Sequence, residues 1–205
     1  MALLSLCIPA GAKSKTLTGF IDKVSSSLVT FDYSFSMQTG KSKMKGTGIV
    51  KVQDNAFYME GNGLEVWCDG KTRWTVDRMA EEALIEAIDD SFDSYATNPA
   101  LMISAVDSAF TEVSSGASKF QGKVADESVL SPKVKGKYSM DISRLKLFFK
   151  TGTAELIGAE VKLNDGSVSE FVIKNLSYSD KTEKKESFRF DEKTLDNSYV
   201  ITDLR

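Results

Sequence analysis

The sequence predicts a single α+β domain made mainly of antiparallel β-strands, with two or three helices. Short segments in which apolar and polar residues alternate recur along most of the 205 residues, which is typical of half-buried strands. Hairpin signals such as Asp69-Gly70 and Asn164-Asp165-Gly166 separate several of these segments. No internal repeat or linker divides the chain, so one sheet is the simplest arrangement.

The first third of the chain changes from a helical to a strand period. From Ser14 to Leu28 the apolar residues follow helical spacing, which predicts an amphipathic helix. A period of two begins at Phe31 and predicts a strand that ends near Met37. Further short strands are expected over residues 44–53, 56–60, 64–68 and 72–77.

The rest of the chain predicts more helix and then more strands. Residues 79–90 are ambiguous: they fit a helix, with a strand over 83–88 as the alternative. Asn98-Pro99 is a typical helix start, and the apolar spacing after it predicts a second helix that closes near Ser114 to Gly116. Later strands are expected over residues 120–124, 134–142, 145–150, 154–163, 168–175 and 186–191, with a charged loop at 180–185.

Residues 1–12 are apolar and end in Ala10-Gly11-Ala12, which predicts a signal-peptide remnant cleaved before Lys13. The predicted mature domain is then 13–205, exported to the periplasm, with Cys68 as its one cysteine and no internal disulfide. A short buried strand is one alternative for residues 1–12. Lipid modification of Cys7 is another, although Leu6 is large for the position before a modified cysteine.

Composition argues against two classes of function. A formal net charge of -3 supplies no basic field for nucleic acid. The chain contains no His, which removes the commonest general base and the commonest metal ligand. We therefore expect no enzyme, no metal and no cofactor. A hydrolase that works through carboxylates is the alternative from another class, although no nucleophile motif accompanies it.

Several strings resemble the LolA-like family of periplasmic carriers of outer-membrane lipoproteins. They are residues 55–57, 67–77 and 98–102 in the first half, then 161–166, 171–175 and 187–191. Residues 200–205 look like a chain end of the Bacteroides-type branch of that family. The resemblance implies an incomplete, half-open curved β-barrel covered by two or three helices, with an apolar cavity for acyl chains. It also implies a monomer that takes acylated lipoprotein from an inner-membrane lipoprotein-releasing transporter and passes it to an outer-membrane acceptor.

One departure from the family concerns the closing of the cavity. Better-known members carry an Arg-Pro pair just before the third strand, where this chain has Gln53-Asp54. Latching of the helical cover by that Arg is therefore not expected here. An envelope sensor of lipids or lipoproteins, or a carrier of another lipid or glycolipid, stays open as an alternative function.

The predicted cavity wall draws on the apolar faces of the strands and of the second helix. Each residue in this set has simple core packing as its alternative role. The candidates are Tyr33, Phe35, Met37, Ile49, Phe57, Met59, Leu64, Val66, Trp74, Val76, Leu101, Met102 and Val106. Trp67 and Trp74 have sugar stacking as a further alternative, and Cys68 is expected to be a small buried side chain rather than a reactive thiol.

Overall fold

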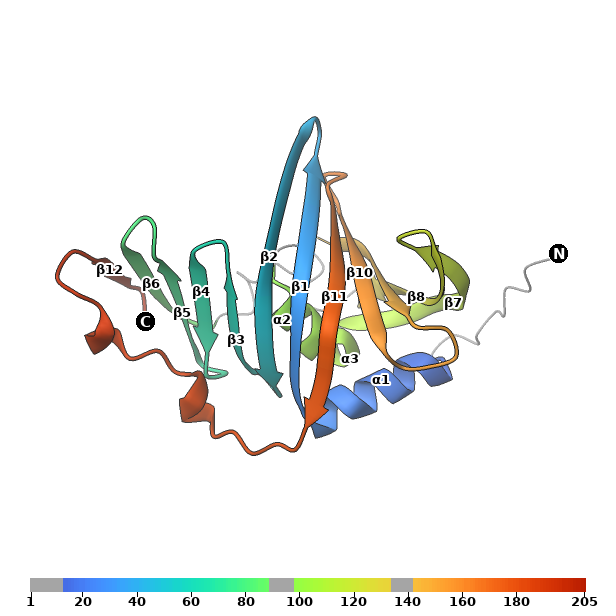
Figure 1. Ribbon diagram of the computed structural model, residues 1–205, viewed down its shortest axis with the longest axis horizontal. Coiled ribbons are helices and arrows are strands. Elements are labelled where there is room, and N and C mark those ends of the chain that lie inside the picture. Colours follow the sequence, from blue (N-terminus) through green and yellow to red (C-terminus); the bar gives the residue numbers. More distant parts are fainter. Residues whose placement is uncertain (1–12, 89–97, 134–141) are drawn as a thin grey trace.

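The protein is one large open sheet, mainly antiparallel, with short helices on one face. The computed structural model describes residues 13–88, 98–133 and 142–205. Their strands form a single sheet in the order β12-β6-β5-β4-β3-β2-β1-β11-β10-β9-β8-β7 (Figure 1). The strands at the two ends of this order do not pair with each other, so the sheet stays open. The predicted α+β class, with an unclosed curved sheet and a few helices, is confirmed.

The chain forms the first half of this sheet from the centre outward and the second half from the opposite edge back to the centre. The first group of strands is β1 Leu28–Thr39, β2 Ser42–Gln53, β3 Ala56–Gly61, β4 Leu64–Cys68, β5 Thr72–Asp77 and β6 Glu82–Ala87. The second group is β7 Phe110–Phe120, β8 Lys123–Pro132, β9 Ile142–Phe149, β10 Leu156–Leu163 and β11 Val168–Ser179. Strand β11 returns to pair with β1 and so joins the two groups.

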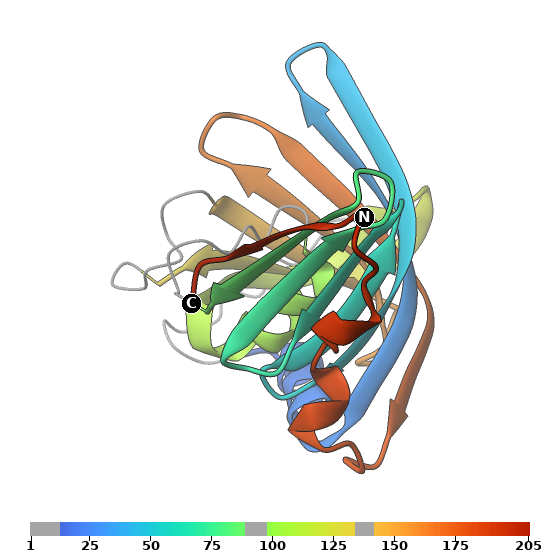
Figure 2. The same cartoon turned by 90° about the vertical axis from the view of Figure 1, so that its left-hand side faces the viewer.

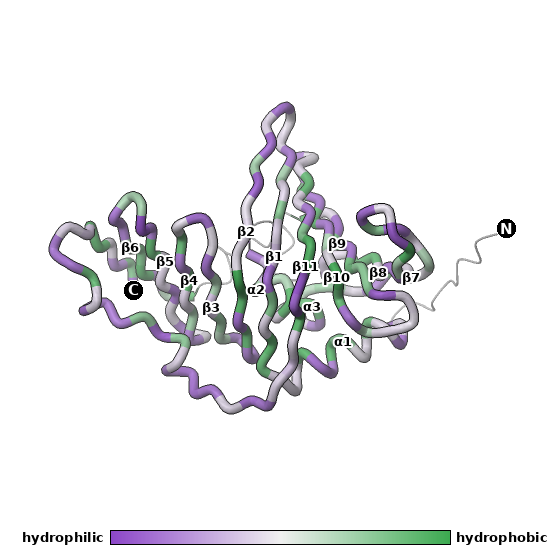
Figure 3. The backbone as a smooth tube through the Cα atoms, in the orientation of Figure 1, coloured by the Kyte–Doolittle hydropathy of each residue, from purple (hydrophilic) through white to green (hydrophobic). Residues whose placement is uncertain are grey.

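Three helices lie on the concave face of the sheet: α1 Lys15–Ser26, α2 Pro99–Ser104 and α3 Val106–Ala109 (Figure 2). Alternation along each strand directs one set of side chains toward them. Leu17 and Phe20 of α1 join Val29 and Phe31 of β1 in the main core. Figure 3 shows the contrast along the β1–β2 hairpin, whose tip is hydrophilic while its lower half alternates between hydrophobic and hydrophilic residues.

The start of α1 is fastened to the first strand after the helices. The Ser14 hydroxyl caps α1 by accepting from the Leu17 amide at 3.2 Å. The same residue donates its amide and its hydroxyl to the carboxylate of Glu112 at 2.6 and 2.9 Å. Glu112 is buried on β7, and Lys13 forms an ion pair with Asp107 beside it. These contacts fix where α1 lies across the concave face.

The convex face is covered in part by the C-terminal segment. After β11 the chain crosses β3 to β6 with two short 3₁₀ helices, η2 Lys185–Phe188 and η3 Glu192–Thr194 (Figure 1). Phe190 packs there on Trp74 and Val76. The segment ends in β12 Val200–Asp203, which pairs in parallel with β6.

Several sequence expectations need correction. The second helix does not run to residues 114–116, because α2 ends at Ser104, α3 is a single turn and β7 begins at Phe110. The β-branched, Ser-rich stretch that follows favours strand over helix. The strand expected at 120–124 is interrupted by a turn: Phe120 ends β7, Gln121 and Gly122 turn with positive φ, and Lys123 begins β8. The strand expected at 186–191 is instead the 3₁₀ helix η2 and the residues after it.

Two further regions complete the comparison. Residues 83–88 lie mostly in strand β6, so the strand alternative is confirmed over Glu82–Ala87. The signal-peptide remnant at 1–12, and most of the strand expected at 134–142, lie outside the described residues. Within the described ranges, no helix has the length and hydropathy that a membrane span requires.

Candidate functional site

The candidate site is a pocket of about 460 Å³ between the concave face and α2, called here the sheet pocket. Its lining comes from neighbouring strands and from the start of the helix. The lining residues are Tyr33, Phe35, Met44, Met59, Gly61, Asn62, Leu64, Val66, Arg73, Thr75, Asn98 and Leu101. Most of these side chains are apolar, so the pocket suits a hydrocarbon ligand.

An aromatic cluster forms one wall of the sheet pocket. The ring of Phe171 on β11 lies 6.3 Å from that of Tyr33 and 6.0 Å from that of Phe35. Burial raises the pKa of Tyr33 above its ordinary value. The ring of Tyr33 lies close over Gly48 of β2 and Gly61 of β3, where a side chain would collide with it. Glycine at these positions therefore allows the aromatic wall to lie against the neighbouring strands.

The opposite wall is the first turn of α2. The Asn98 side chain accepts hydrogen bonds from the amides of Ala100 and Leu101 at 3.0 and 3.1 Å, and Pro99 occupies the first helical position. This is the capping pattern expected from the sequence. The cap fixes the orientation of α2 and so holds Leu101 at the edge of the pocket.

One end of the sheet pocket is polar. Arg73 on β5 contacts the carboxylate of Glu86 on β6, with Nη2 to Oε2 at 3.0 Å and Nε to Oε2 at 3.3 Å. Thr75 lies two residues further along the same face of β5. The pocket thus combines a mainly apolar lining with a charged side chain on β5, an arrangement that suits an amphiphile.

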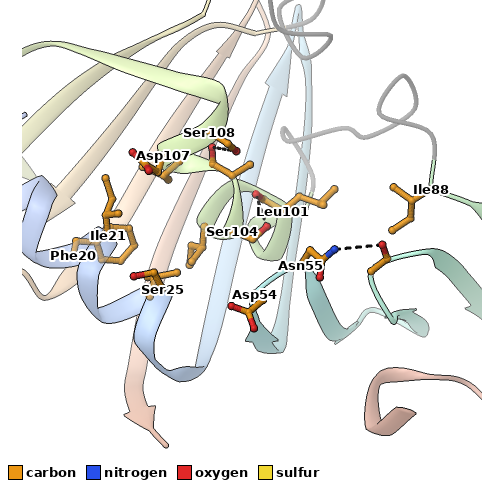
Figure 4. A pocket seen from close by; sticks show the side chains of 15 residues that line it. Phe20, Ile21, Ser25, Asp54, Asn55, Ile88, Leu101, Ser104, Asp107 and Ser108 are labelled. Carbon is orange, nitrogen blue, oxygen red and sulfur yellow. Dashed lines mark hydrogen bonds between the residues drawn. The ribbon is translucent and has the colours of Figure 1, made fainter. Parts of the chain in front are cut away.

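A second pocket, called here the helix pocket, lies between α1 and the α2–α3 region and has a volume of about 390 Å³ (Figure 4). Its apolar floor includes Phe20, Ile21 and Val24 of α1. Its other lining residues are Ser25, Asp54, Asn55, Gly70, Ile88, Leu101, Ile103, Ser104, Ala105, Val106, Asp107 and Ser108. The Asn55 amide donates to the carbonyl of Gly70 at 3.3 Å and joins two turns at this edge.

The structure brings part of the predicted cavity wall together. Six of the candidates line the sheet pocket, namely Tyr33, Phe35, Met59, Leu64, Val66 and Leu101. Val106 lines the helix pocket. Phe57 and Met102 are buried in the main core, and Met37 lies on the same face of β1 as Tyr33, opposite Met44.

Three candidates lie elsewhere. Ile49 pairs with Asp32 and Glu60, so it lies on the convex face, where it is 46% exposed. Trp74 and Val76 also lie on the convex face and pack under Phe190. The Trp74 indole donates to Glu192 at 2.9 Å, and Trp67 packs at a tilt against Tyr58 with ring centroids 4.3 Å apart. Both tryptophans are therefore engaged in packing.

Other pocket residues escaped the sequence reasoning. Met44 lies on the same face of β2 as Gly46 and Gly48. The alternation along this strand could therefore have assigned Met44 to that face from the sequence. Arg73 and Thr75 were hidden because the apolar members of β5 are Trp74 and Val76, which face the other way. The Gln53-Asp54 pair fastens the C-terminal segment: Gln53 donates to the Glu183 carbonyl at 2.8 Å, and Asp54 forms an ion pair with Lys181.

A metal centre has no support in the described residues, which contain no group of three or more His, Cys, Asp or Glu side chains placed to hold an ion. Cys68 is fully buried, and its sulfur contacts the carbonyl of Asn55 at 3.5 Å and accepts from the Gly70 amide at 3.3 Å. Its environment is that of a packed core residue.

Comparison with known proteins identifies solved structures of similar shape. No protein-family model and no curated protein sequence matches the chain. An uncharacterized conserved protein from Thermus thermophilus is 8% identical over 92% of this chain and 97% of its own, with a TM-score of 0.52. This similarity indicates a shared fold.

Two further solved structures align over most of their length. A DUF1329 family protein from Desulfovibrio piger is 15% identical over 90% of this chain and 100% of its own, with a TM-score of 0.49. A LolA superfamily protein from Nitrosomonas europaea is 8% identical over 86% of this chain and 99% of its own, with a TM-score of 0.47.

Proposed function

We propose that the protein is a non-catalytic periplasmic carrier that holds acyl chains of a lipid or lipoprotein in the sheet pocket. The observation that carries the proposal is the apolar pocket between the concave face of an open sheet and α2. An open sheet leaves space at its hollow side that a closed small barrel fills with its own side chains. The helices cover this space without filling it.

The free energy of acyl binding is consistent with transport. Each buried methylene contributes about 0.8 kcal/mol, so a long chain gains on the order of 10 kcal/mol before entropy and cavity costs. A carrier must bind this strongly and still release its cargo. Opening or collapse of the space under α2 would lower the net affinity to a transferable range.

The family resemblance supplies the proposed partners. The acylated cargo would arrive from an inner-membrane lipoprotein-releasing transporter and leave to an outer-membrane acceptor, with the carrier acting as a monomer. The latch differs from the one described for that family, since Gln53 and Asp54 hold the C-terminal segment instead. We propose that the capped α2 and the fastened α1 hold the cover in place here.

A matched pair of substitutions tests the proposal. Met59→Lys introduces an ammonium into the sheet pocket, whereas Ile49→Lys introduces it on the convex face of the adjacent strand, opposite Glu60. Palmitate binding, measured by displacement of a fluorescent fatty acid, should weaken by about tenfold or more for Met59→Lys, because an ammonium is costly in an apolar site. It should stay within about twofold of wild type for Ile49→Lys.

Both variants must keep the wild-type circular dichroism spectrum for the comparison to count. Equal palmitate affinity in the two lysine variants would contradict the assignment of the sheet pocket. Absence of palmitate binding to wild-type protein stripped of lipid would contradict the carrier function itself.

A further inference from the structure

The β1–β2 hairpin projects beyond the rest of the sheet (Figure 1, Figure 2). Strand β3 pairs with β2 only from Ile49 onward, so residues 42–48 have no strand partner on that side within the described ranges. On the other side, β11 stays paired with β1 as far as Gln38. The outer part of the hairpin, residues 38–48, is therefore open to contact from outside the molecule.

This outer part carries lysines and no carboxylate. Lys41, Lys43 and Lys45 are exposed, and residues 33–53 contain no Asp or Glu. No ion pair within the described part of the chain involves any of these three lysines. The whole chain, by contrast, has a formal net charge of -3. The hairpin is therefore a local positive patch on a mildly acidic protein.

Two of these lysines line an open groove of about 490 Å³ along the hairpin. Lys43, Lys45 and Thr47 share the convex face of β2. Lys45 pairs with Ser36 of β1 and Thr47 pairs with Ser34, and all of these side chains line the groove. Ammonium and hydroxyl groups that converge on one groove are the donors that suit a phosphate group.

One carboxylate also lines the groove, that of Glu170 on β11. It accepts a hydrogen bond from the side chain of Gln121 at 2.5 Å. The two lysine ammonium groups of the groove therefore keep an excess of positive charge over this single carboxylate. Lys41, in the turn of the hairpin, adds a further positive charge nearby.

The opposite face of the hairpin carries an exposed apolar side chain. Met44 lies between Lys43 and Lys45 in the chain, points to the concave side and is 50% exposed. It also lines the sheet pocket. An exposed apolar side chain flanked by lysines suits the boundary between water and lipid, because the ammonium groups reach the headgroups while the apolar side chain enters the layer below.

We propose that this hairpin docks the protein on an anionic lipid surface. Lys43 and Lys45 meet lipid phosphates along the groove, Lys41 meets them at the turn, and Met44 enters the apolar layer. Docking at this point places the lipid surface beside the sheet pocket, because Met44 lines that pocket. The inference goes beyond the proposed carrier function, since docking requires neither bound cargo nor a protein partner.

The composition of the patch favours a lipid surface over an acidic protein. Its charges are all lysines, which are depleted at protein–protein interfaces, and residues 33–53 contain no arginine, which is enriched there. Lysine also acts as a mobile point charge, whereas the planar fork of arginine suits a fixed carboxylate partner. Headgroups that move laterally can meet such charges without a fixed geometry.

Co-sedimentation with lipid vesicles tests the proposal. Wild-type protein should bind vesicles of equal parts phosphatidylglycerol and phosphatidylcholine, and should not bind phosphatidylcholine alone. The triple variant Lys41→Gln, Lys43→Gln and Lys45→Gln should bind the anionic vesicles about a hundredfold more weakly, about fivefold for each lysine. Met44→Ser should weaken binding by about fivefold, because part of an apolar side chain is lost from the contact.

The matched control is the triple variant Lys71→Gln, Lys174→Gln and Lys184→Gln, at exposed positions outside the hairpin. It changes the net charge by the same amount and should bind anionic vesicles within about twofold of wild type. Palmitate affinity of the hairpin triple variant should also stay within about twofold of wild type, which separates the loss of docking from a failure of the carrier function.

Equal vesicle binding by the two triple variants would overturn the proposal, as would the absence of vesicle binding by wild-type protein. Binding of glycerol 3-phosphate without vesicle binding would show a site for free phosphate instead. Binding of polyglutamate without vesicle binding would assign the patch to an acidic protein. Either of these results would also overturn docking on lipid.

Discussion

The close approach of strands β2 and β3 beneath the aromatic wall predicts a large penalty for adding one methyl group at Gly48. A Cβ at this position would lie 2.1 Å from the backbone oxygen of Glu60 and 2.7 Å from both Cε1 and Oη of Tyr33. Ordinary contacts of a Cβ begin at 3.4 Å. The oxygen belongs to the paired strand, so β2 and β3 must separate before the methyl group fits.

We expect Gly48→Ala to lower the free energy of unfolding by about 2 kcal/mol. Forced overpacking costs about 1–3 kcal/mol, and backbone atoms place this site at the upper end. Replacing glycine inside a strand returns roughly 0.5–1 kcal/mol. Gly46→Ala should cost less, because its nearest neighbours are the side-chain ends of Asn62 and Phe35, at 2.0 and 2.4 Å.

Gly116→Ala on β7 is the matched control, since no described atom beyond its chain neighbours lies within 4 Å of its added Cβ. It should raise the free energy of unfolding by about 0.5 kcal/mol. Urea denaturation followed by tryptophan fluorescence measures all three variants. A Gly48→Ala protein as stable as Gly116→Ala would refute the close approach of β2, β3 and the Tyr33 ring.

Three other predictions concern single side chains. Tyr178→Phe should keep or slightly raise stability at neutral pH, because the buried hydroxyl has no hydrogen-bond partner among the described residues. Burial raises the pKa of Tyr178 to about 12, so wild-type stability should fall as pH rises from about 10 to about 12. The fall measured by urea denaturation should be shallower in the variant, and equal slopes would contradict the assignment. Glu112→Ala removes both acceptors for Ser14. It should lower the free energy of unfolding by about 2–3 kcal/mol and speed hydrogen exchange of the α1 amides. Unchanged exchange in α1 would show that the Ser14–Glu112 hydrogen bonds do not hold the helix in place. Phe188→Ala, at a side chain 1% exposed, should cost about 3–4 kcal/mol in thermal or urea unfolding, and a loss below about 1 kcal/mol would show that the C-terminal segment is only loosely packed.

The sheet was predictable where alternation and turn chemistry agree. The period of two after Phe31 predicted β1, and Asp69-Gly70 predicted the β4–β5 hairpin, where Gly70 has φ of 88°. The cap at Asn98-Pro99 predicted the start of α2. Its end was not predictable from apolar spacing, because Val106 and Ala109 continue the helical pattern up to the residue where β7 begins.

The side of the sheet was harder to predict than the strands themselves. Alternation shows that Trp74 and Val76 share a face, but it does not show which face lines the cavity. The C-terminal segment supplies Phe190 as a second cover, so both faces of β5 are partly buried. This distant contact hid Arg73 and Thr75 from sequence reasoning. The helix pocket was also hidden from sequence reasoning, because it depends on how α1 and α2 meet, two elements that lie far apart in the sequence.

The content of the pockets in freshly prepared protein tests the central claim most directly. Native mass spectrometry of protein purified gently from a bacterial periplasm, followed by lipid extraction, measures it without any assumption about cargo. The carrier proposal predicts an acylated molecule at close to one per chain, lost in Met59→Lys and retained in Ile49→Lys. The mass of the protein alone, with no bound lipid before or after incubation with dipalmitoyl phosphatidylglycerol, would contradict it.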